Sequence, residues 1–209
     1  MIKEDHPFEF LNQLLFSRQN MRLQFSKYVY KEDSLFDERV IVNVQTNDLD
    51  KKKVEKLITG LSDNEELALH SRVVVGGRTY HIPMIDFAAL DALEEEDLNR
   101  LSYFIMKPIY REMEFYSSGR SFHAYSTRLL SPKEWLEFNG RLLLVDIDDK
   151  KRIIDTRWVG HRIISGYSSL RWSCNTKQHS EYPKRLGTYK ITNCLEFGSK
   201  KVMSQGFKF

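Results

Sequence analysis

Hydrophobic and polar residues follow two different periods along the first third of the chain. Apolar side chains between residues 8 and 30 have helical spacing over the first half of that stretch, which predicts a helix packed against the core. Residues 39–44 alternate and are rich in β-formers, whereas residues 51–61 have helical character and end near Gly60. The order helix, strand, helix is therefore predicted for this region.

Glycine, proline and capping residues divide the next part of the chain into short elements. Two glycines separate the β-rich runs 72–75 and 78–82, and paired glycines permit the positive φ angles of a tight hairpin turn. Four acids from residue 94 onward open an amphipathic helix that Pro108 should kink or end. Residues 131–134 combine an N-cap serine, a first-turn proline and a glutamate, so they start a further helix.

A strand, a tight turn and a second strand are predicted for residues 115–125, because tyrosines flank a central Ser-Gly pair. The period of two on the second strand places Ser121, His123 and Tyr125 on one face and the two residues between them on the other. We expect the latter face to join the core. The former can carry chemistry, because a hydroxyl, an imidazole and the nearby Arg120 can direct hydrogen-bond donors at one anion. An ordinary half-exposed strand with a polar face is the alternative.

Two short apolar runs that end in aspartate lie on either side of this Ser-x-His strand. The upstream run reaches Asp86, and the downstream run reaches Asp155. After the second aspartate, a segment that alternates polar and apolar side chains carries Arg171, and Lys177 follows it. Over residues 73–177 this order of motifs resembles the archaeo-eukaryotic primase superfamily, the primase-polymerases.

The resemblance implies an α+β fold in which a mainly antiparallel, RRM-like sheet carries the site and helices pack around it. It also implies metal-dependent nucleotidyl transfer from a nucleoside triphosphate to the 3′ end of a nucleic acid, as in DNA primases and polymerases. Asp86 and Asp155 would hold Mg²⁺ or Mn²⁺, and His123 would complete the catalytic set. The implied partners are nucleoside triphosphates, a DNA or RNA template or primer, and proteins of replication or repair.

We assign contacts with the incoming nucleotide to five side chains: Ser121, His123, Arg120, Arg171 and Lys177. Because a guanidinium can fork onto two phosphate oxygens, Arg171 is expected on the triphosphate. A solvent-facing arginine on an ordinary strand is the alternative for this residue.

One position departs from the family's first motif, which usually has two aspartates separated by one residue. The second of them is Ala88 here, and Asp91 could replace it from the next turn. Residues 142–149 contain a rival apolar-Asp-x-Asp run that starts at Asp146, but it follows the Ser-x-His strand and reads more easily as a charged loop. A catalytically degenerate module that binds nucleotide or nucleic acid is therefore the alternative function, and an unrelated α+β domain is a third.

Asp155 has a second expected role as the N-cap of a helix that could run to Gly166. Capping and metal binding are compatible, because a carboxylate has several lone pairs. Arg157, His161 and Ser165 would share one face of this helix and form a polar stripe that begins beside the acid.

The composition is that of a globular protein, with 41% hydrophobic and 29% charged residues. We expect a single domain over residues 1–209, because that length suffices for one well-filled core. The sequence has no apolar run of the roughly 20 residues that span a bilayer, no signal-peptide pattern, and only Cys174 and Cys194 as cysteines. A cytoplasmic protein without membrane contact or disulfide framework is expected.

Charge is distributed unevenly, although the net charge is only +3. Residues 156–209 contain ten lysines or arginines and two acids, whereas residues 1–155 contain 22 and 27. Such a basic C-terminal part suits a polyanionic partner, and a solvated basic face is the alternative. His6, His70 and His179 lack neighbours at metal-site spacing and are expected at the surface.

Overall fold

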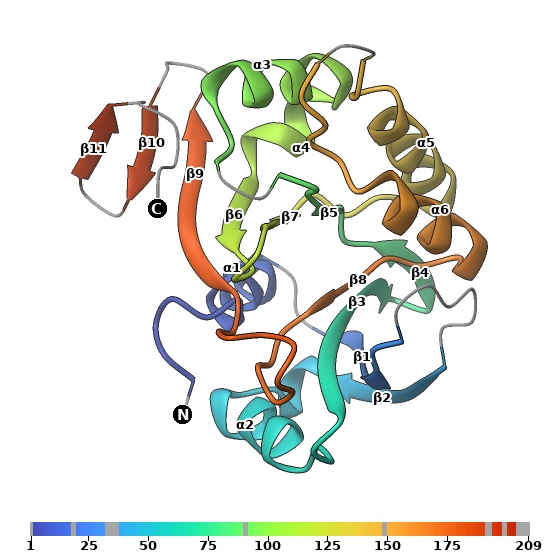
Figure 1. Cartoon of the computed structure of the whole chain (residues 1–209). Coiled ribbons are helices and arrows are strands. Elements are labelled where there is room, and N and C mark those ends of the chain that lie inside the picture. Colours follow the sequence, from blue (N-terminus) through green and yellow to red (C-terminus); the bar gives the residue numbers. More distant parts are fainter. Residues whose placement is uncertain are drawn as a thin grey trace.

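Antiparallel pairing joins the strands of this protein into two sheets (Figure 1). The computed structural model describes residues 2–17, 20–31, 38–89, 92–147, 150–190, 194–197 and 200–203. The first sheet contains β1 (Met21–Val29), β2 (Arg39–Gln45), β3 (Glu65–Val75), β4 (Arg78–His81) and β8 (Ser169–Arg171). The second sheet contains β5 (Met84–Asp86), β6 (Met113–Ser117), β7 (Phe122–Ser126), β9 (Lys184–Lys190), β10 (Cys194–Phe197) and β11 (Lys200–Met203). The predicted α+β class with antiparallel pairing is confirmed.

Strand order brings segments that are far apart in the sequence next to each other. The first sheet has the order β2-β1-β3-β4, and β8 pairs with β3 from more than 90 residues away. The second has the order β11-β10-β9-β6-β7-β5. Strands β5 and β8 also contact each other, so the two sheets meet where these short strands lie side by side.

The helices are distributed between the two sheets (Figure 1). They are α1 (Phe8–Ser17), α2 (Lys51–Thr59), α3 (Glu95–Phe104), α4 (Lys107–Arg111), α5 (Pro132–Leu143) and α6 (Thr156–Ser165), with a short 3₁₀ turn, η1 (Thr46–Asp48). Helix α2 packs with the first sheet, and α1 packs against both sheets. Helices α3 to α6 pack with the second sheet, and α5 also contacts β4 of the first. Within the described ranges, none of these helices has the length and apolar character needed to cross a membrane.

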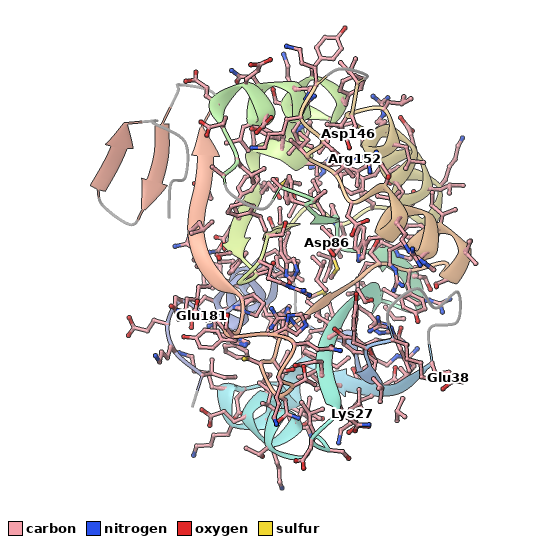
Figure 2. All side chains as sticks on the ribbon, in the orientation of Figure 1. Lys27, Glu38, Asp86, Asp146, Arg152 and Glu181 are labelled. Carbon is pink, nitrogen blue, oxygen red and sulfur yellow. The ribbon has the colours of Figure 1, made fainter. Side chains whose placement is uncertain are left out.

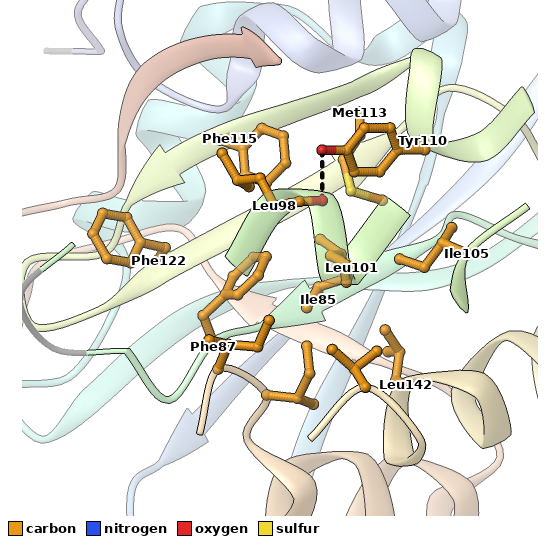
Figure 3. Packing of buried hydrophobic residues seen from close by; sticks show 14 of the residues in the cluster. Ile85, Phe87, Leu98, Leu101, Ile105, Tyr110, Met113, Phe115, Phe122 and Leu142 are labelled. Atoms are coloured by element: carbon orange, nitrogen blue, oxygen red, sulfur yellow. Dashed lines mark hydrogen bonds between the residues drawn. The ribbon is translucent and has the colours of Figure 1, made fainter. Parts of the chain in front are cut away.

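One core cluster lies between the second sheet and helices α3 to α6. Figure 3 shows Phe115 of β6 beside Leu98 of α3, and Phe122 of β7 belongs to the same cluster. In the same cluster the Tyr110 hydroxyl donates to the Leu98 carbonyl at 3.1 Å, which ties α4 to α3. This packing fixes one face of the β6–β7 pair.

The opposite face of β6 and β7 is also buried, against α1 and the first sheet. Tyr116 and Tyr125 belong to this second cluster, and the Tyr125 hydroxyl accepts a hydrogen bond from Trp172 Nε1 at 3.2 Å. His123 lies between these layers and is only 5% exposed. On the face of β7 that was predicted to carry chemistry, Tyr125 is therefore covered by α1 and the first sheet, whereas His123 lines a pocket.

The N-terminal prediction is correct for the first half of residues 8–30 and wrong for the second half. Helix α1 ends at Ser17, and β1 starts at Met21 after Asn20, whose φ of 60° lies in the left-handed region. Alternate side chains of β1 at Met21, Leu23 and Phe25 are buried. A period of two, set by packing in the first sheet, therefore replaces the helical period after residue 20.

The turn and cap predictions are confirmed. The glycines between β3 and β4 have φ of 55° and 78°, as a primed hairpin turn requires. Ser131 and Glu134 form the predicted capping box of α5, and Asp155 caps α6, which ends at Gly166 with φ of 74°. Pro108 lies in the first turn of α4, so the predicted break separates α3 from α4.

Two histidines expected at the surface are buried. His6 is 2% exposed, and its Nε2 is 2.8 Å from the carbonyl oxygen of Trp172. His70 is fully buried, with Nε2 2.8 Å from the hydroxyl of Ser26. Both histidines contact residues that are distant in the sequence, and the local spacing of residues cannot reveal such contacts.

Candidate functional site

Asp86 and Asp155 are brought together by backbone pairing. Asp86 ends β5 and Asp155 caps α6, and the Asp155 N–H donates to the Asp86 carbonyl at 3.1 Å. Phe87 and Ile154 form a β-bridge, and the Ala88 N–H donates to the carbonyl of residue 153 at 3.0 Å. Two segments about 70 residues apart thus run side by side, and both acids line one pocket.

Burial and repulsion shift the pKa of Asp86. Burial raises the pKa of Asp86 to about 8, and the negative charge of Asp155 adds to that rise. Arg171 and Arg162 act in the opposite direction on the same pKa. The Asp155 carboxylate itself accepts a hydrogen bond from the Trp158 N–H at 2.8 Å, which leaves lone pairs for a further contact.

His123 lies directly opposite Asp86, because β5 and β7 pair these two residues. Its Nε2 is 3.6 Å from Asp86 Oδ1, which is too long for a good hydrogen bond. Burial lowers the pKa of His123 well below its usual value, and the positive charge of Arg171 lowers it further, so the ring is neutral near pH 7. Its buried Nδ1 has no hydrogen-bond partner within the described part of the chain.

A pocket of about 1040 Å³ surrounds these groups. Its lining includes eight lysines or arginines and four acids, so the walls are basic around the acid pair. Figure 2 shows Asp86 near the middle of the molecule, with Lys27 and Glu38 toward the first sheet. The pocket therefore combines carboxylates that suit a hard cation with arginines that suit phosphate.

Of the five residues predicted to contact the nucleotide, four line the pocket and Lys177 does not. Arg120, Ser121, His123 and Arg171 line the pocket together. Arg120 is exposed, and the Ser121 hydroxyl donates to the Phe87 carbonyl. Lys177 is exposed on the loop after β8 and lies outside the pocket lining.

Arg171 is placed differently from the expected fork onto phosphate. Its side chain is buried, and its two terminal nitrogens donate to the carbonyls of Ser118, Ser173 and Glu181, the last at 3.0 Å. These bonds hold the β6–β7 turn against the loop that follows β8. Arg171 thus shapes the pocket wall and contributes positive charge to it.

Two pocket residues escaped the sequence patterns. Arg162 is buried on α6 and donates to the Ser169 hydroxyl at 2.8 Å. It lies seven residues after Asp155, a helical spacing that could have identified it. Arg157 and His161 of the predicted polar stripe line the same pocket. His179 also lines the pocket, and burial together with Arg171 lowers its pKa to about 4. No local pattern signals His179, because the loop between β8 and β9 places it.

Asp146, the rival acid, has a structural contact. Its carboxylate accepts hydrogen bonds from the backbone N–H groups of Ile153 at 2.9 Å and Ile154 at 3.3 Å. Asp146 therefore holds the segment that carries Asp155, consistent with the charged-loop interpretation. Asp91 and the two acids after residue 147 lie outside the described residues.

Asp86 and Asp155 are the candidate ligands for a divalent metal in this pocket. Across the described ranges, no group of three or more His, Cys, Asp or Glu side chains is arranged to hold a metal ion. Mg²⁺, however, is commonly held by one or two carboxylates and completes its coordination with water and substrate phosphates. Asp86 and Asp155 fit that pattern, whereas Ala88, which also lines the pocket, offers no oxygen from its side chain.

Comparison with known families gives one match. The family model for archaeo-eukaryotic primase 1D-like proteins matches residues 45–184, which is more than half of the chain and includes both aspartates. Comparison with curated proteins and with solved structures returned no match. The resemblance drawn from the order of the motifs is confirmed, and the chain belongs to the archaeo-eukaryotic primase 1D-like family.

Proposed function

We propose that this protein transfers nucleotides from nucleoside triphosphates to the 3′ end of a DNA or RNA strand, with Mg²⁺ or Mn²⁺ bound by Asp86 and Asp155. The main support is the acid pair itself, which lies in a basic pocket where burial and the charge of Asp155 raise the pKa of Asp86. A divalent cation that contacts both carboxylates would relieve this repulsion. Family membership supports primase- or polymerase-like chemistry as the reaction class.

The residues around the acid pair have distinct proposed roles. The metal ion, when bound, supplies activation of the 3′ hydroxyl and neutralisation of phosphate charge. His123 lies opposite Asp86, and its neutral ring avoids competing with the metal for the carboxylates. Arg120, exposed beside the turn, would contact the phosphates, while Arg171 holds that turn in place.

A second candidate function is a catalytically degenerate module that binds a nucleotide or nucleic acid without turnover. Ala88 favours this alternative, because the usual second carboxylate of the first motif is missing from the pocket wall. The two candidates share the nucleotide pocket, so they differ in turnover and not in nucleotide binding.

Primer extension separates the two functions. The purified protein is incubated with a labelled primer on a template, with ribo- or deoxynucleoside triphosphates, and with Mg²⁺ or Mn²⁺. Metal-dependent lengthening of the primer is expected, and EDTA should abolish it. Asp48→Asn is the matched control, because Asp48 is an exposed acid in η1 and does not line the pocket.

The outcomes are distinct. Extension by the control but not by Asp155→Asn supports metal-dependent transfer at this site. Nucleotide binding without extension in the unaltered protein would favour the degenerate module. Neither binding nor extension would overturn both candidates and leave a domain whose polar strands serve packing alone.

We further infer that residues 1–209 fold as one domain, because Trp158 packs against both core clusters. Limited proteolysis should then give no stable fragment that lacks either sheet. A protease-resistant fragment with only one of the two sheets would contradict this inference.

A further inference from the structure

The segment that precedes α1 contacts both ends of the loop that joins β8 to β9. Residues 2–7 are here called the N-terminal strap, and residues 172–183 are called the β8–β9 loop. Figure 1 shows the strap passing beside the start of β9 on its way to α1. Two adjacent residues of the strap, Asp5 and His6, bond to the loop and to the first residues of β9.

His6 holds the first end of the β8–β9 loop. Burial lowers the pKa of His6 to about 4, so the ring is neutral near pH 7. Its Nδ1 accepts a hydrogen bond from the Phe8 N–H at 3.0 Å, so the ring proton lies on Nε2 and is donated to the Trp172 carbonyl at 2.8 Å. The rings of His6 and Trp172 also meet edge to face, with 5.4 Å between their centres.

Asp5 holds the other end of the loop. Its carboxylate accepts a hydrogen bond from the Tyr182 hydroxyl at 2.8 Å, and its carbonyl accepts one from the Arg185 N–H at 2.6 Å. Burial and the bond to Asp5 raise the pKa of Tyr182 to about 12, so the hydroxyl keeps its proton and donates it. The Arg185 guanidinium in turn bonds to Glu114 of β6 at 3.0 Å. This end is therefore tied to the strap and to the second sheet.

His179 lies between two anchored parts of the β8–β9 loop. Before it, the Glu66 carboxylate accepts hydrogen bonds from Ser173, Asn175 and Thr176. After it, Tyr182 is held by the strap. Residues 177–181 are described and contain no helix or strand, so the anchors on either side set their course. The position of His179 thus depends on the strap as well as on Glu66.

His179 reaches the pocket from this loop. It lines the pocket together with Arg120 and His123, and it lies close enough to His123 to contribute to the lowered pKa of that ring. Burial, and then the charge of Arg171, keep the His179 ring itself neutral near pH 7. A neutral imidazole offers one hydrogen-bond donor and one acceptor, which suits the sugar hydroxyls or base edge of a nucleotide.

We propose that Asp5 and His6 are positioning residues, which hold His179 against a bound nucleoside triphosphate through the β8–β9 loop. This inference rests on the nucleotide pocket of the proposed function, which both candidate functions share. The strap lies outside the pocket lining, so loosening it moves the loop and leaves the acid pair in place. The expected result is a higher KM for the nucleotide with little change in kcat.

Two measurements test the strap: the affinity for a fluorescent nucleoside triphosphate with Mn²⁺, and hydrogen–deuterium exchange of residues 172–183. Asp5→Ala should bind about fivefold more weakly and exchange faster in this loop. Asp5→Asn should restore both values, because its amide oxygen still accepts from the Tyr182 hydroxyl. Asp48→Ala is the matched control, since Asp48 is an exposed acid outside the strap and the pocket lining.

Tyr182→Phe removes the other partner of the same bond and should repeat the loss seen in Asp5→Ala. Its matched control is Tyr103→Phe, because Tyr103 is 84% exposed on α3 and lies outside the pocket lining. His6→Ala leaves a cavity in a buried site, so these milder variants carry the test.

A double-variant cycle links the strap to His179. Once His179 is replaced by alanine, Asp5→Ala should weaken nucleotide binding no further, because the strap acts through that side chain. Equal affinity of Asp5→Ala and Asp48→Ala, or an equal loss with and without His179, would overturn the positioning role. No nucleotide binding by the unaltered protein would overturn it together with the nucleotide pocket. The expected cycle in a protein that binds nucleotide but extends no primer would support the strap and reject turnover alone.

Discussion

Two acidic side chains near the junction of the sheets have opposite surroundings. Glu66 of β3 is fully buried, and its carboxylate accepts hydrogen bonds from Ser173, Asn175 and Thr176, with the Thr176 N–H at 2.8 Å. Asp86 of β5 faces the pocket with a side chain 24% exposed. No hydrogen bond reaches its carboxylate from the described part of the chain, and Asp155 repels it.

The comparison separates Glu66, whose carboxylate holds a loop in place, from Asp86, for which we propose a role in metal binding. The bonds to Glu66 hold the loop after β8 against the first sheet, so its charge is already satisfied. The charge of Asp86 is opposed by burial and by a like charge, which only an external cation can offset fully. Burial alone therefore does not mark a candidate metal ligand, whereas burial without hydrogen bonds supports the role proposed for Asp86.

The largest expected effect is loss of activity in Asp86→Asn. The amide has nearly the same shape but cannot balance a divalent cation, so primer extension should fall by about a thousandfold or more. Circular dichroism should show an unchanged fold, because the side chain makes no hydrogen bond in the described structure. Extension at the rate of Asp48→Asn would remove Asp86 from the catalytic set.

Glu66→Gln should show the reverse pattern, with lost stability. The amide group of glutamine points N–H donors at backbone N–H groups that now donate to the carboxylate. Loss of charged hydrogen bonds in a buried site should lower the free energy of unfolding by about 3 kcal/mol, measured by urea denaturation. A variant as stable as Asp48→Asn would mean that Glu66 does not anchor the loop.

The comparison also predicts a pH dependence for the metal-free protein. The folded-state pKa of Asp86 is about 8, whereas the ordinary value is 3.8, so the folded state binds the proton more tightly. Its contribution to stability is fully present below about pH 4 and is lost as pH rises to about 8. In EDTA, Asp86→Asn should therefore gain stability relative to the unaltered protein between pH 5 and pH 8. A constant difference across that range would show that Asp86 titrates normally.

The smallest expected effect is a gain from Ala88→Asp. Ala88 lines the same pocket as Asp86, so a carboxylate there would add oxygen donors toward the proposed metal site. Extension should rise modestly at low Mn²⁺, and stability without metal should fall because of charge repulsion. The measurement is primer extension against Mn²⁺ concentration, together with thermal unfolding. No gain in either would favour the degenerate binding module.

The sequence predicted local features better than contacts between distant segments. The caps of α5 and α6 and the hairpin glycines follow from neighbouring residues, so they were predictable. The burial of both faces of β7 depends on α1 and the first sheet, which local periodicity cannot show.

In the candidate site, too, residues in local motifs were predicted and contacts between distant segments were not. Asp86, Asp155 and His123 were found from the order of motifs, and the structure places them in one pocket. His179 was missed because a loop with no regular pattern brings it there. Arg171 was found, but its bonds to the Ser118 carbonyl and the loop after β8 could not be predicted, since they join three separate segments.

Direct binding of Mn²⁺ tests the central claim that Asp86 and Asp155 together hold a divalent metal. Isothermal titration calorimetry or electron paramagnetic resonance should detect bound Mn²⁺ in the unaltered protein and in Asp48→Asn, with a nucleoside triphosphate present. The expected result is a loss of that binding in both Asp86→Asn and Asp155→Asn. Equal Mn²⁺ binding by all four proteins would contradict the claim and place the metal elsewhere.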